Sequence, residues 1–392
     1  MVKVIIIQQV MKQYRLPFFL RLHDTLAMRG IDLTVAYSEP SKAHAARKDN
    51  VELPAHVGLK VKAYWFFNRL VYQPLWKHIA AADLVVIGPE IKYVINPLLL
   101  LMSALGLKTV AFWGLGPNRF PGRSNVAEWI KVKFFTKVNW WFAYTDTIAD
   151  YLKKRGMPAA QITTVQNATD TSGLRRLIED IPDEDSASQK LALTGSTESR
   201  VGIYCGMLQE IKALPFLIET ARRVRQRCSS FHLLVVGDGP ERAWLEREIA
   251  DEPWIHYLGA AFDRKKALCY KIADISLLGG TVGLAIVDSF AAGLPLLATQ
   301  LPTHPPEISY VRDGWNGRLV PHDSAEFSEA IVETISNPAT LSKLRAGAWE
   351  SGGRYTMETM VENFSNGIIS CLSASGCLSP DVSKWATQAN ER

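Results

Sequence analysis

Short apolar runs alternate with amphipathic stretches along almost the whole chain. In the first half we expect strands at residues 3–7, 32–37, 59–64, 83–87, 108–113, 141–144 and 162–166. In the second half strands are expected at 201–205, 232–236, 254–257, 275–278, 294–299 and 317–320. Runs that are apolar throughout, such as LLVV, are typical of parallel sheets covered on both faces. The pattern therefore predicts an α/β protein with two doubly wound, Rossmann-like parallel sheets.

A polar stretch with many turn-forming residues, IPDEDSASQKLALTGSTESR, separates the two series of strands. We expect an N-terminal domain at 1–170, a connecting stretch at 171–200 and a second domain at 201–355. A helix at 356–373 is expected to return to the first domain, with a loose tail at 374–392. The acidic triplet at 183–185 lies in the connecting stretch, where the expectation is a solvated loop and not a metal site.

The composition of the 392-residue chain is that of an ordinary globular protein, with 47% hydrophobic and 21% charged residues. This excludes collagen-like and wholly disordered classes. The five cysteines lack the spacing of a zinc site or a disulfide framework, which favours a reducing, cytoplasmic compartment. The N-terminal run MVKVIIIQQV is expected to be a core strand rather than a signal peptide, and the apolar run at 94–107 is too short to cross a bilayer.

Charge changes this picture, because it is unevenly distributed. Residues 1–170 contain 22 Lys and Arg against 11 Asp and Glu, whereas residues 171–392 contain 22 against 28. A basic half is typical of proteins with an anionic partner, such as a phospholipid surface, a phosphorylated acceptor or nucleic acid. The basic residues form no long cluster and no nucleic-acid motif is present, so nucleic acid is the least favoured of these partners.

Three segments that follow strands carry candidate chemistry. Lys212, in GMLQEIK, precedes a helix and is either a phosphate ligand or a solvated surface lysine. The segment GGTVGL opens a helix whose N-terminal N–H groups can bind a diphosphate. Asp288 lies one turn inside that helix, where it either accepts hydrogen bonds from ribose hydroxyls or pairs with a neighbouring lysine. The segment VVGDGPE is not a dinucleotide fingerprint, because Arg242 stands where the third glycine is required.

Taken in order, several segments resemble the C-terminal half of retaining glycosyltransferases of the GT-B fold, specifically the large family 4 (group 1). They are GMLQEIKALPFLIETA, LLVVGDGPERAWLE, WIHYLGAAFDRKKALCYKIADISLLGG, TVGLAIVDSFAAGLPLLAT and HPPEISYVRDGWNGRLVP. VQNATDTSGL is similar to the family's block near the hinge. The resemblance implies two Rossmann-like domains facing a central cleft, a UDP- or GDP-sugar donor on the second domain and a glycan or lipid-linked acceptor on the first. It requires no metal or other cofactor.

The resemblance also assigns residues. Lys212 matches the lysine that contacts the donor diphosphate, and Asp288 matches the second glutamate of a Glu-x7-Glu element that holds the ribose; these two are expected to carry the reaction. The remaining donor-binding residues implied by the matched blocks are Gly206, Ala261, Asp263, Thr281, Val282, Gly283 and Leu284. In this scheme Lys212 and the helix N-terminus neutralise charge on the leaving diphosphate, and no protein nucleophile is assigned.

Three positions depart from the family pattern. Gly280 stands where the first glutamate of the Glu-x7-Glu element is expected. Met207 stands where family members have an arginine that contacts the diphosphate together with the lysine. Leu115 lies at or next to the position at which many members have a histidine in the N-terminal domain. With these losses the sequence is compatible with an enzyme that uses an unusual donor. The alternative is a non-catalytic sugar-nucleotide-binding or partner subunit of the GT-B fold. A GT-B enzyme of different chemistry, such as an epimerase, is a further rival.

The N-terminal half offers weaker acceptor-side candidates at the ends of strands: Arg15, Glu90, Asn118 and Arg119. Surface or capping roles compete with acceptor contact for each of them. The aromatic and lysine-rich segment at 123–141 either packs its apolar stripe on a sheet or contacts an anionic membrane. We therefore expect polysaccharide or surface-glycan synthesis, with possible peripheral association at the inner face of the cytoplasmic membrane.

Overall fold

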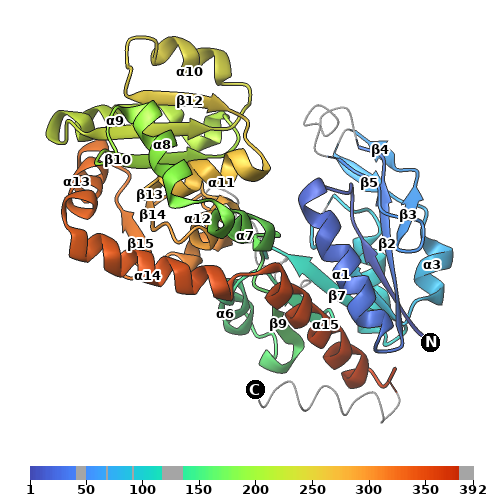
Figure 1. Cartoon of the computed structure of the whole chain (residues 1–392). Helices are drawn as coiled ribbons and strands as arrows, with labels where there is room; N and C mark the ends of the chain where they lie inside the picture. Colours follow the sequence, from blue (N-terminus) through green and yellow to red (C-terminus); the bar gives the residue numbers. More distant parts are fainter. Residues whose placement is uncertain (41–49, 68, 91, 117–135, 379–392) are drawn as a thin grey trace. The chain divides into compact units, whose positions relative to one another are not determined.

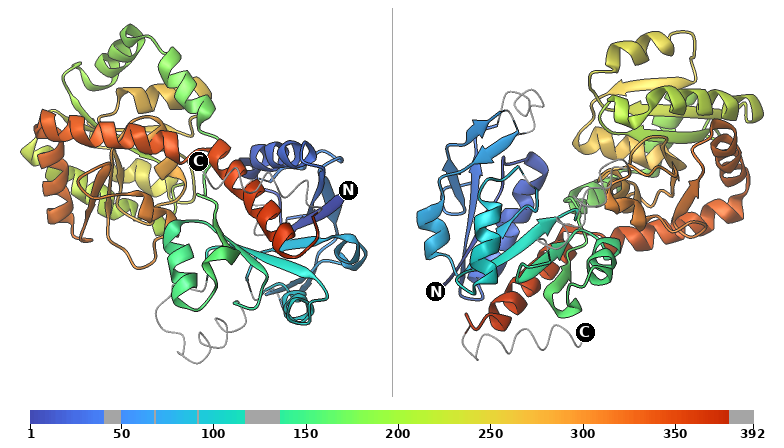
Figure 2. Two further views of the ribbon diagram at one scale, coloured as in Figure 1. Left: turned by 90° about the horizontal axis from the view of Figure 1, so that it is seen from below. Right: turned by 180° about the vertical axis from the view of Figure 1, so that it is seen from behind.

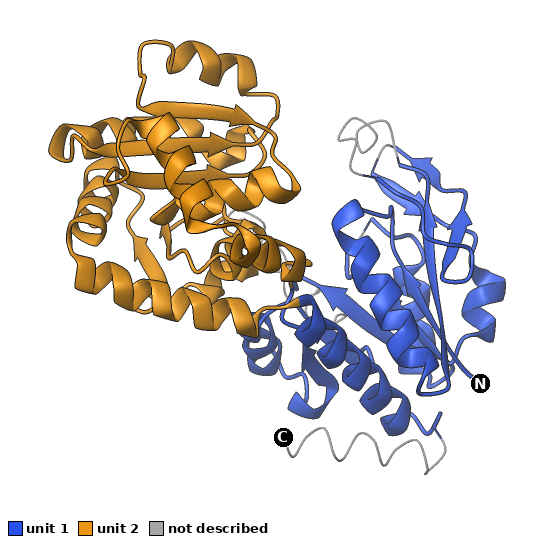
Figure 3. Cartoon of the chain, viewed as in Figure 1, with its two compact units in different colours: residues 1–167, 357–392 blue, residues 168–356 orange. Residues whose placement is uncertain are grey.

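The computed structural model describes residues 1–40, 50–67, 69–90, 92–116 and 136–378, and the chain divides into two compact units. Unit 1 comprises Met1–Asn167 and Met357–Arg392, and unit 2 comprises Ala168–Thr356 (Figure 3). Each unit is built on one parallel sheet (Figure 1). The α/β class and the two Rossmann-like sheets expected from the sequence are confirmed.

The sheet of unit 1 has seven parallel strands in the order β3-β2-β1-β6-β7-β8-β9. Their bounds are β1 Val2–Ile7, β2 Ile31–Ser38, β3 Gly58–Val61, β6 Leu84–Ile87, β7 Thr109–Gly114, β8 Trp140–Ala143 and β9 Ile162–Thr164. The helices described in this unit are α1 Leu16–Ala27, α3 Trp76–Ala81, α4 Asn96–Ala104, α6 Asp146–Lys154 and α15 Met357–Ala374, with short 3-10 turns at Gln13–Arg15 and Ala159–Gln161.

Helix α15 belongs to unit 1 although it is the last helix among the described residues (Figure 1 and Figure 2). Its Phe364 packs edge-on against Phe18 of α1 and stacks on Phe142 of β8, with ring centroids 5.4 and 4.2 Å apart. These rings lie in one of two buried apolar clusters of the unit. Burial of large aromatic side chains supplies much of the stability of such a core, so α15 is an integral part of unit 1.

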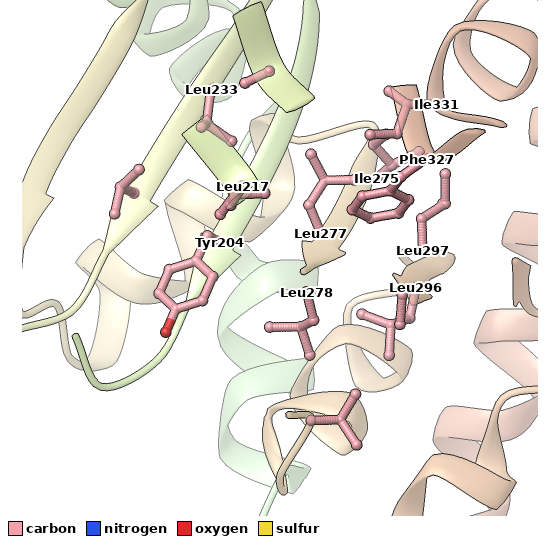
Figure 4. Packing of buried hydrophobic residues seen from close by; sticks show 14 of the residues in the cluster. Tyr204, Leu217, Leu233, Ile275, Leu277, Leu278, Leu296, Leu297, Phe327 and Ile331 are labelled. Atoms are coloured by element: carbon pink, nitrogen blue, oxygen red, sulfur yellow. The ribbon is translucent and has the colours of Figure 1, made fainter. Parts of the chain in front are cut away.

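The sheet of unit 2 has six parallel strands in the order β12-β11-β10-β13-β14-β15. Their bounds are β10 Arg200–Cys205, β11 Phe231–Val236, β12 Ile255–Gly259, β13 Ile275–Leu278, β14 Leu296–Thr299 and β15 Gly317–Val320. The helices are α7 Ser172–Asp180, α8 Asp183–Thr194, α9 Leu214–Arg227, α10 Arg242–Glu248, α11 Asp263–Ile272, α12 Ala285–Ala291, α13 Ser324–Ser336 and α14 Pro338–Arg354, with 3-10 turns at Glu210–Lys212 and Pro306–Tyr310. Figure 4 shows part of the larger apolar cluster between this sheet and its helices.

The expected strands lie within about two residues of the observed ones, with one exception. The run at 59–64 is not a single strand: β3 ends at Val61 and a new strand, β4 (Tyr64–Phe66), forms an antiparallel hairpin with β5 (Leu70–Tyr72). Aromatic and β-branched residues recur through 59–72 and no Gly or Pro interrupts them, so the pattern does not show where one strand stops and the next begins.

The expectation of a solvated loop around residues 183–185 is wrong, because these residues form the first turn of α8. Pro182 precedes the helix, three carboxylates complement its N-terminal dipole, and Gly195 ends it in a left-handed conformation with φ of 73°. Leu174 and Ile181, from α7 and its end, are buried against the α11 side of the sheet. The polar composition of this stretch reflects the exposed faces of two short helices.

Candidate functional site

The strand order of unit 2 creates a switch point between β10 and β13. From these two neighbouring strands the chain continues toward opposite edges of the sheet. Loops that follow such strands diverge and leave a crevice at the carboxyl ends, where ligands of open α/β sheets bind. The two loops here are residues 206–213 after β10 and residues 279–284 after β13. They contain most of the donor-binding residues expected from the sequence.

These two loops are bonded to each other. The N–H and the hydroxyl of Thr281 both donate to the carbonyl oxygen of Ile211, at 2.9 and 3.0 Å, and the Lys212 ammonium donates to the carbonyl oxygen of Thr281 at 2.6 Å. The close approach depends on Gly280, where an added Cβ would lie 2.3 Å from the carbonyl carbon of Lys212. Packing of the Lys212 turn therefore explains why a glycine stands at position 280.

Lys212 is a cation in a partly desolvated position. Burial lowers the pKa of its ammonium to about 8. Within the described residues it forms no ion pair, and a Cβ at Gly283 would lie 3.6 Å from its Nζ. The N–H groups of Gly283 and Leu284 donate to no acceptor in the described part of the chain. An ammonium and two unsatisfied N–H groups on adjoining segments suit an anionic ligand.

His304 supports the same loop from its other side, and the sequence reasoning missed it. The buried imidazole accepts a hydrogen bond from the N–H of Val282 at its Nδ1 (3.1 Å) and donates from Nε2 to the carbonyl oxygen of Thr299 (2.6 Å). These two bonds require the neutral tautomer with hydrogen on Nε2. The N–H groups of Thr281 and Val282 are thus used to shape the loop, while those of Gly283 and Leu284 keep no acceptor among the described residues.

Asp288 pairs with a lysine, Lys266 of α11, which the sequence reasoning did not single out. The ammonium lies 2.8 Å from the Asp288 carboxylate, and both side chains are largely buried. Burial lowers the pKa of Lys266, but the negative charge of Asp288 outweighs it and the pKa is raised overall. Cys205, at the end of β10, adjoins the pair, and burial raises the pKa of its thiol. The pair offers a donor and an acceptor side by side.

The remaining donor-side candidates lie along the same edge of the sheet. Gly206 approaches the end of β11 so closely that a Cβ at Gly237 would lie 1.8 Å from its carbonyl oxygen. Ala261 is buried, and Asp263 is exposed with φ of 46° at the start of α11, one turn before Lys266. The side chain of Met207 is exposed, and its carbonyl oxygen accepts a hydrogen bond from the hydroxyl of Tyr204 at 2.8 Å.

The acceptor-side candidates of unit 1 differ in burial and contacts, and two of them lie outside the described residues. Arg15 is only 6% exposed; its guanidinium donates to Asn167 Oδ1 at 2.6 Å and lies over the ring of Trp113. Its guanidinium is thus in contact with other residues of unit 1. Glu90 is exposed and lies 4.0 Å from Lys92. Leu115 is exposed after β7. Asn118, Arg119 and most of the segment at 123–141 lie outside the described residues.

The acidic triplet of α8 is engaged with basic side chains of α11. Asp183 lies 3.0 Å from Lys271, and Asp185 lies 2.7 Å from Arg264. Across the described residues, no group of three or more His, Cys, Asp or Glu side chains is arranged to hold a metal ion. In the same part of the chain no helix has both the length and the apolar character needed to span a membrane.

A family model matches a large part of unit 2. Residues 199–337 match the family model described as "Glycosyl transferases group 1". Phosphatidyl-myo-inositol mannosyltransferase of Mycobacterium leprae is 29% identical over 149 residues, which are 37% of this chain and 39% of that protein. Alpha-monoglucosyldiacylglycerol synthase of Acholeplasma laidlawii is 25% identical over 169 residues, 42% of each. The matches thus span about two fifths of the length of these relatives.

Similarity of fold extends over both units. The structure of Anabaena HepE in complex with UDP matches with a TM-score of 0.66 at 16% identity, covering 94% of this chain and 99% of that one. At this level of identity the likeness shows the fold alone. The two parallel-sheet units accordingly have the GT-B fold, as the resemblance in the sequence implied.

Proposed function

We propose that this chain, whose residues 199–337 form a group 1 glycosyltransferase domain, transfers a sugar with retention from a nucleotide-sugar donor to a glycan or lipid-linked acceptor. The observation that carries the proposal is the arrangement around Lys212. A partly buried ammonium, hydrogen-bonded to the next loop, adjoins two unsatisfied N–H groups at the switch point of the sheet. A donor diphosphate supplies the negative charge that this arrangement lacks.

The same groups account for the chemistry. When the bond between the sugar and the diphosphate breaks, negative charge grows on the leaving diphosphate. Lys212 and the N–H groups of Gly283 and Leu284 stabilise this charge in place, without reorganisation of solvent. Asp288 accepts hydrogen bonds from the ribose hydroxyls, and the ion pair with Lys266 orients its carboxylate. No protein nucleophile is assigned, and retention rests on the resemblance to family 4.

A UDP- or GDP-sugar is the proposed donor. HepE, which shares the fold, binds UDP in its crystal structure, and this supports a nucleoside diphosphate as the ligand class. The names of the two relatives describe a mannosyltransferase of phosphatidyl-myo-inositol and an enzyme that makes a glucosyldiacylglycerol, so they favour a lipid acceptor. The setting we propose is glycan or glycolipid synthesis at the inner face of the cytoplasmic membrane.

Calorimetry with UDP and GDP, followed by an assay of sugar release from the corresponding nucleotide sugars, tests the proposal. We expect one of the two nucleotides to bind, and its sugar conjugates to be turned over slowly to water or faster to an acceptor. Failure of both nucleotides to bind would contradict the proposal.

A second function is favoured by Gly280 and Met207, which remove a carboxylate and a cation that family 4 members use. On that account the chain binds a sugar nucleotide as a non-catalytic partner subunit. Tight binding with no turnover across donors and acceptors would support this second function over the first.

A further inference from the structure

The β4–β5 hairpin of unit 1 presents one side of its two strands to the surroundings (Figure 1). Tyr64 pairs with Tyr72 and Phe66 with Leu70, and paired residues point to the same side of a sheet. Tyr64 and Phe66 are each 45% exposed. The alternate residues Trp65 and Val71 point the other way and pack on the apolar core of the unit. The hairpin is therefore anchored by one side, and the described residues leave the other side partly exposed.

The end of β4 adds a residue with an unusual conformation. Phe67 follows β4 directly, is 90% exposed and has φ of 51°. A bulky residue in the left-handed region is strained, and a Phe side chain in water gains nothing from burial. Phe67 thus combines two unfavourable features, both of which a contact with an apolar partner would offset.

Aromatic and apolar side chains continue beyond the hairpin. The indole N–H of Trp76 donates to the hydroxyl of Tyr72 at 3.0 Å. The N–H of Val71 donates to the carbonyl oxygen of Lys92, and the N–H of Val94 donates to the carbonyl oxygen of Val71. Residues 92–94 therefore lie alongside β5 in a parallel direction. Val71 is paired with Tyr93, so the next residue, Val94, lies on the exposed side with Tyr72. We call the following set the hairpin face: Tyr64, Phe66, Phe67, Leu70, Tyr72, Trp76 and Val94.

Basic residues predominate around the hairpin face, where the acidic Glu90 lies 4.0 Å from Lys92. Residues 53–82 contain four Lys and Arg and no Asp or Glu. Lys60 is paired with Glu39 and Glu52. Lys62, Arg69 and Lys77 are exposed and form no ion pair within the described residues, and Lys62 Nζ lies 5.3 Å from the centre of the Tyr64 ring. Cations next to exposed Tyr, Trp and Phe are the combination that favours the headgroup region of an anionic bilayer.

We propose that the hairpin face docks unit 1 on a bilayer that contains anionic phospholipid. The aromatic side chains enter the headgroup region, and the three unpaired cations contact lipid phosphates. A second copy of the chain is a poorer occupant, because pairing two such faces brings their unpaired cations together. The proposal does not depend on sugar transfer, since it concerns a surface of unit 1 remote in sequence from the loops of unit 2.

Co-sedimentation of the full chain with sucrose-loaded vesicles tests the proposal. Vesicles of phosphatidylcholine with about one third phosphatidylglycerol are compared with vesicles of phosphatidylcholine alone. We expect binding to the anionic vesicles, at least tenfold weaker binding to the neutral ones, and a loss of affinity as salt is raised. The triple variant Lys62→Gln/Arg69→Gln/Lys77→Gln should bind on the order of 100-fold more weakly, from about fivefold per cation.

Matched variants separate the hairpin face from bulk charge and exposed apolar surface. Lys153→Gln/Lys154→Gln/Arg155→Gln removes the same charge from α6 of unit 1, and Met28→Ser removes an exposed apolar side chain after α1. Phe67→Ser should weaken vesicle binding about tenfold whereas Met28→Ser should not. Equal effects of the two triple variants, or pelleting that is independent of vesicles and rises with protein concentration, would overturn the proposal. The circular dichroism of each variant shows that it is folded.

Discussion

The ammonium of Lys266 lies 2.8 Å from the carboxylate of Asp288, which joins the first turn of α11 to α12 at the edge of the sheet where Lys212 is found. The pair is largely buried, so each charge depends on the other for its solvation. It also shows that an apolar helix, AIVDSFAAG, accommodates an aspartate because a neighbouring helix supplies the counter-charge. The pairing and the proposed ribose contact are compatible, since a carboxylate accepts several hydrogen bonds.

The Lys266–Asp288 pair should show energetic coupling. Lys266→Met leaves the Asp288 carboxylate without its partner, and Asp288→Asn does the same to the ammonium, so each should lower the free energy of unfolding by about 1–2 kcal/mol. The double variant should lose less than the sum of the two single losses. Urea unfolding of the four proteins measures this cycle, and strictly additive losses would show that the pair is not coupled.

Gly280 should not tolerate a side chain. An added Cβ meets the backbone of Lys212 at 2.3 Å, so Gly280→Ala should displace that turn, cost about 1–3 kcal/mol and weaken nucleotide binding at least tenfold. Gly280→Glu, which restores the carboxylate of the family pattern, should be at least as damaging. Gly173→Ala in α7 is the control, since no atom lies within 4 Å of its added Cβ. Wild-type binding by Gly280→Ala in calorimetry would contradict the packing argument.

Met207 should accept a cation with a gain in function. Its side chain is exposed and lies on the loop that carries Lys212, so Met207→Arg should place a second positive charge near the diphosphate. We expect about tenfold tighter binding of the nucleotide in calorimetry, the scale of one partly exposed charge-assisted hydrogen bond. Leu191→Arg on α8 adds the same charge elsewhere in unit 2. If both variants bind alike, the gain comes from bulk charge and not from position 207.

Nucleotide binding should weaken at alkaline pH. Burial lowers the pKa of Lys212 to about 8, so its ammonium is largely charged at pH 7 and loses its proton as the pH rises through 8. Because the charged form binds the diphosphate, affinity should be constant below pH 8 and fall up to tenfold per pH unit above it. Lys212→Arg keeps its charge to much higher pH and should abolish this fall. An identical alkaline fall in that variant would assign the titration to another group.

Much of the fold follows from local pattern, and the exceptions have physical causes. Apolar runs bounded by turn residues locate the parallel strands, since the central strands are buried on both faces and each leaves a short signal of its own. The β4–β5 hairpin was missed because β3 and β4 are separated by only two residues, Lys62 and Ala63, and neither is a turn former. The helix α8 was missed because its surface is polar, so the composition of a loop and that of a short solvated helix coincide.

Some residues of the candidate site could likewise be predicted from the sequence, and others could not. Lys212 and the glycines around 280–283 stand out because they follow strands and match a known family pattern. Lys266 and His304 do not stand out, because each contacts a residue distant in sequence. Lys266 forms an ion pair with Asp288, and His304 accepts a hydrogen bond from the N–H of Val282. A single lysine in DRKKAL or a single histidine in HPPE carries no local sign of such a contact. Only the tertiary packing of unit 2 brings Lys266 next to α12 and His304 next to the loop after β13.

The central claim is that Lys212 binds the diphosphate of a nucleotide donor, and calorimetric titration of UDP and GDP into the wild type and Lys212→Met tests it most directly. The substitution keeps most of the aliphatic side chain and removes a partly buried charge together with its hydrogen bond to Thr281, so the thermal midpoint should change little. The account predicts that the wild type binds one of the two nucleotides and that Lys212→Met binds it at least about 30-fold more weakly. Equal affinity of a folded Lys212→Met and the wild type would contradict the account.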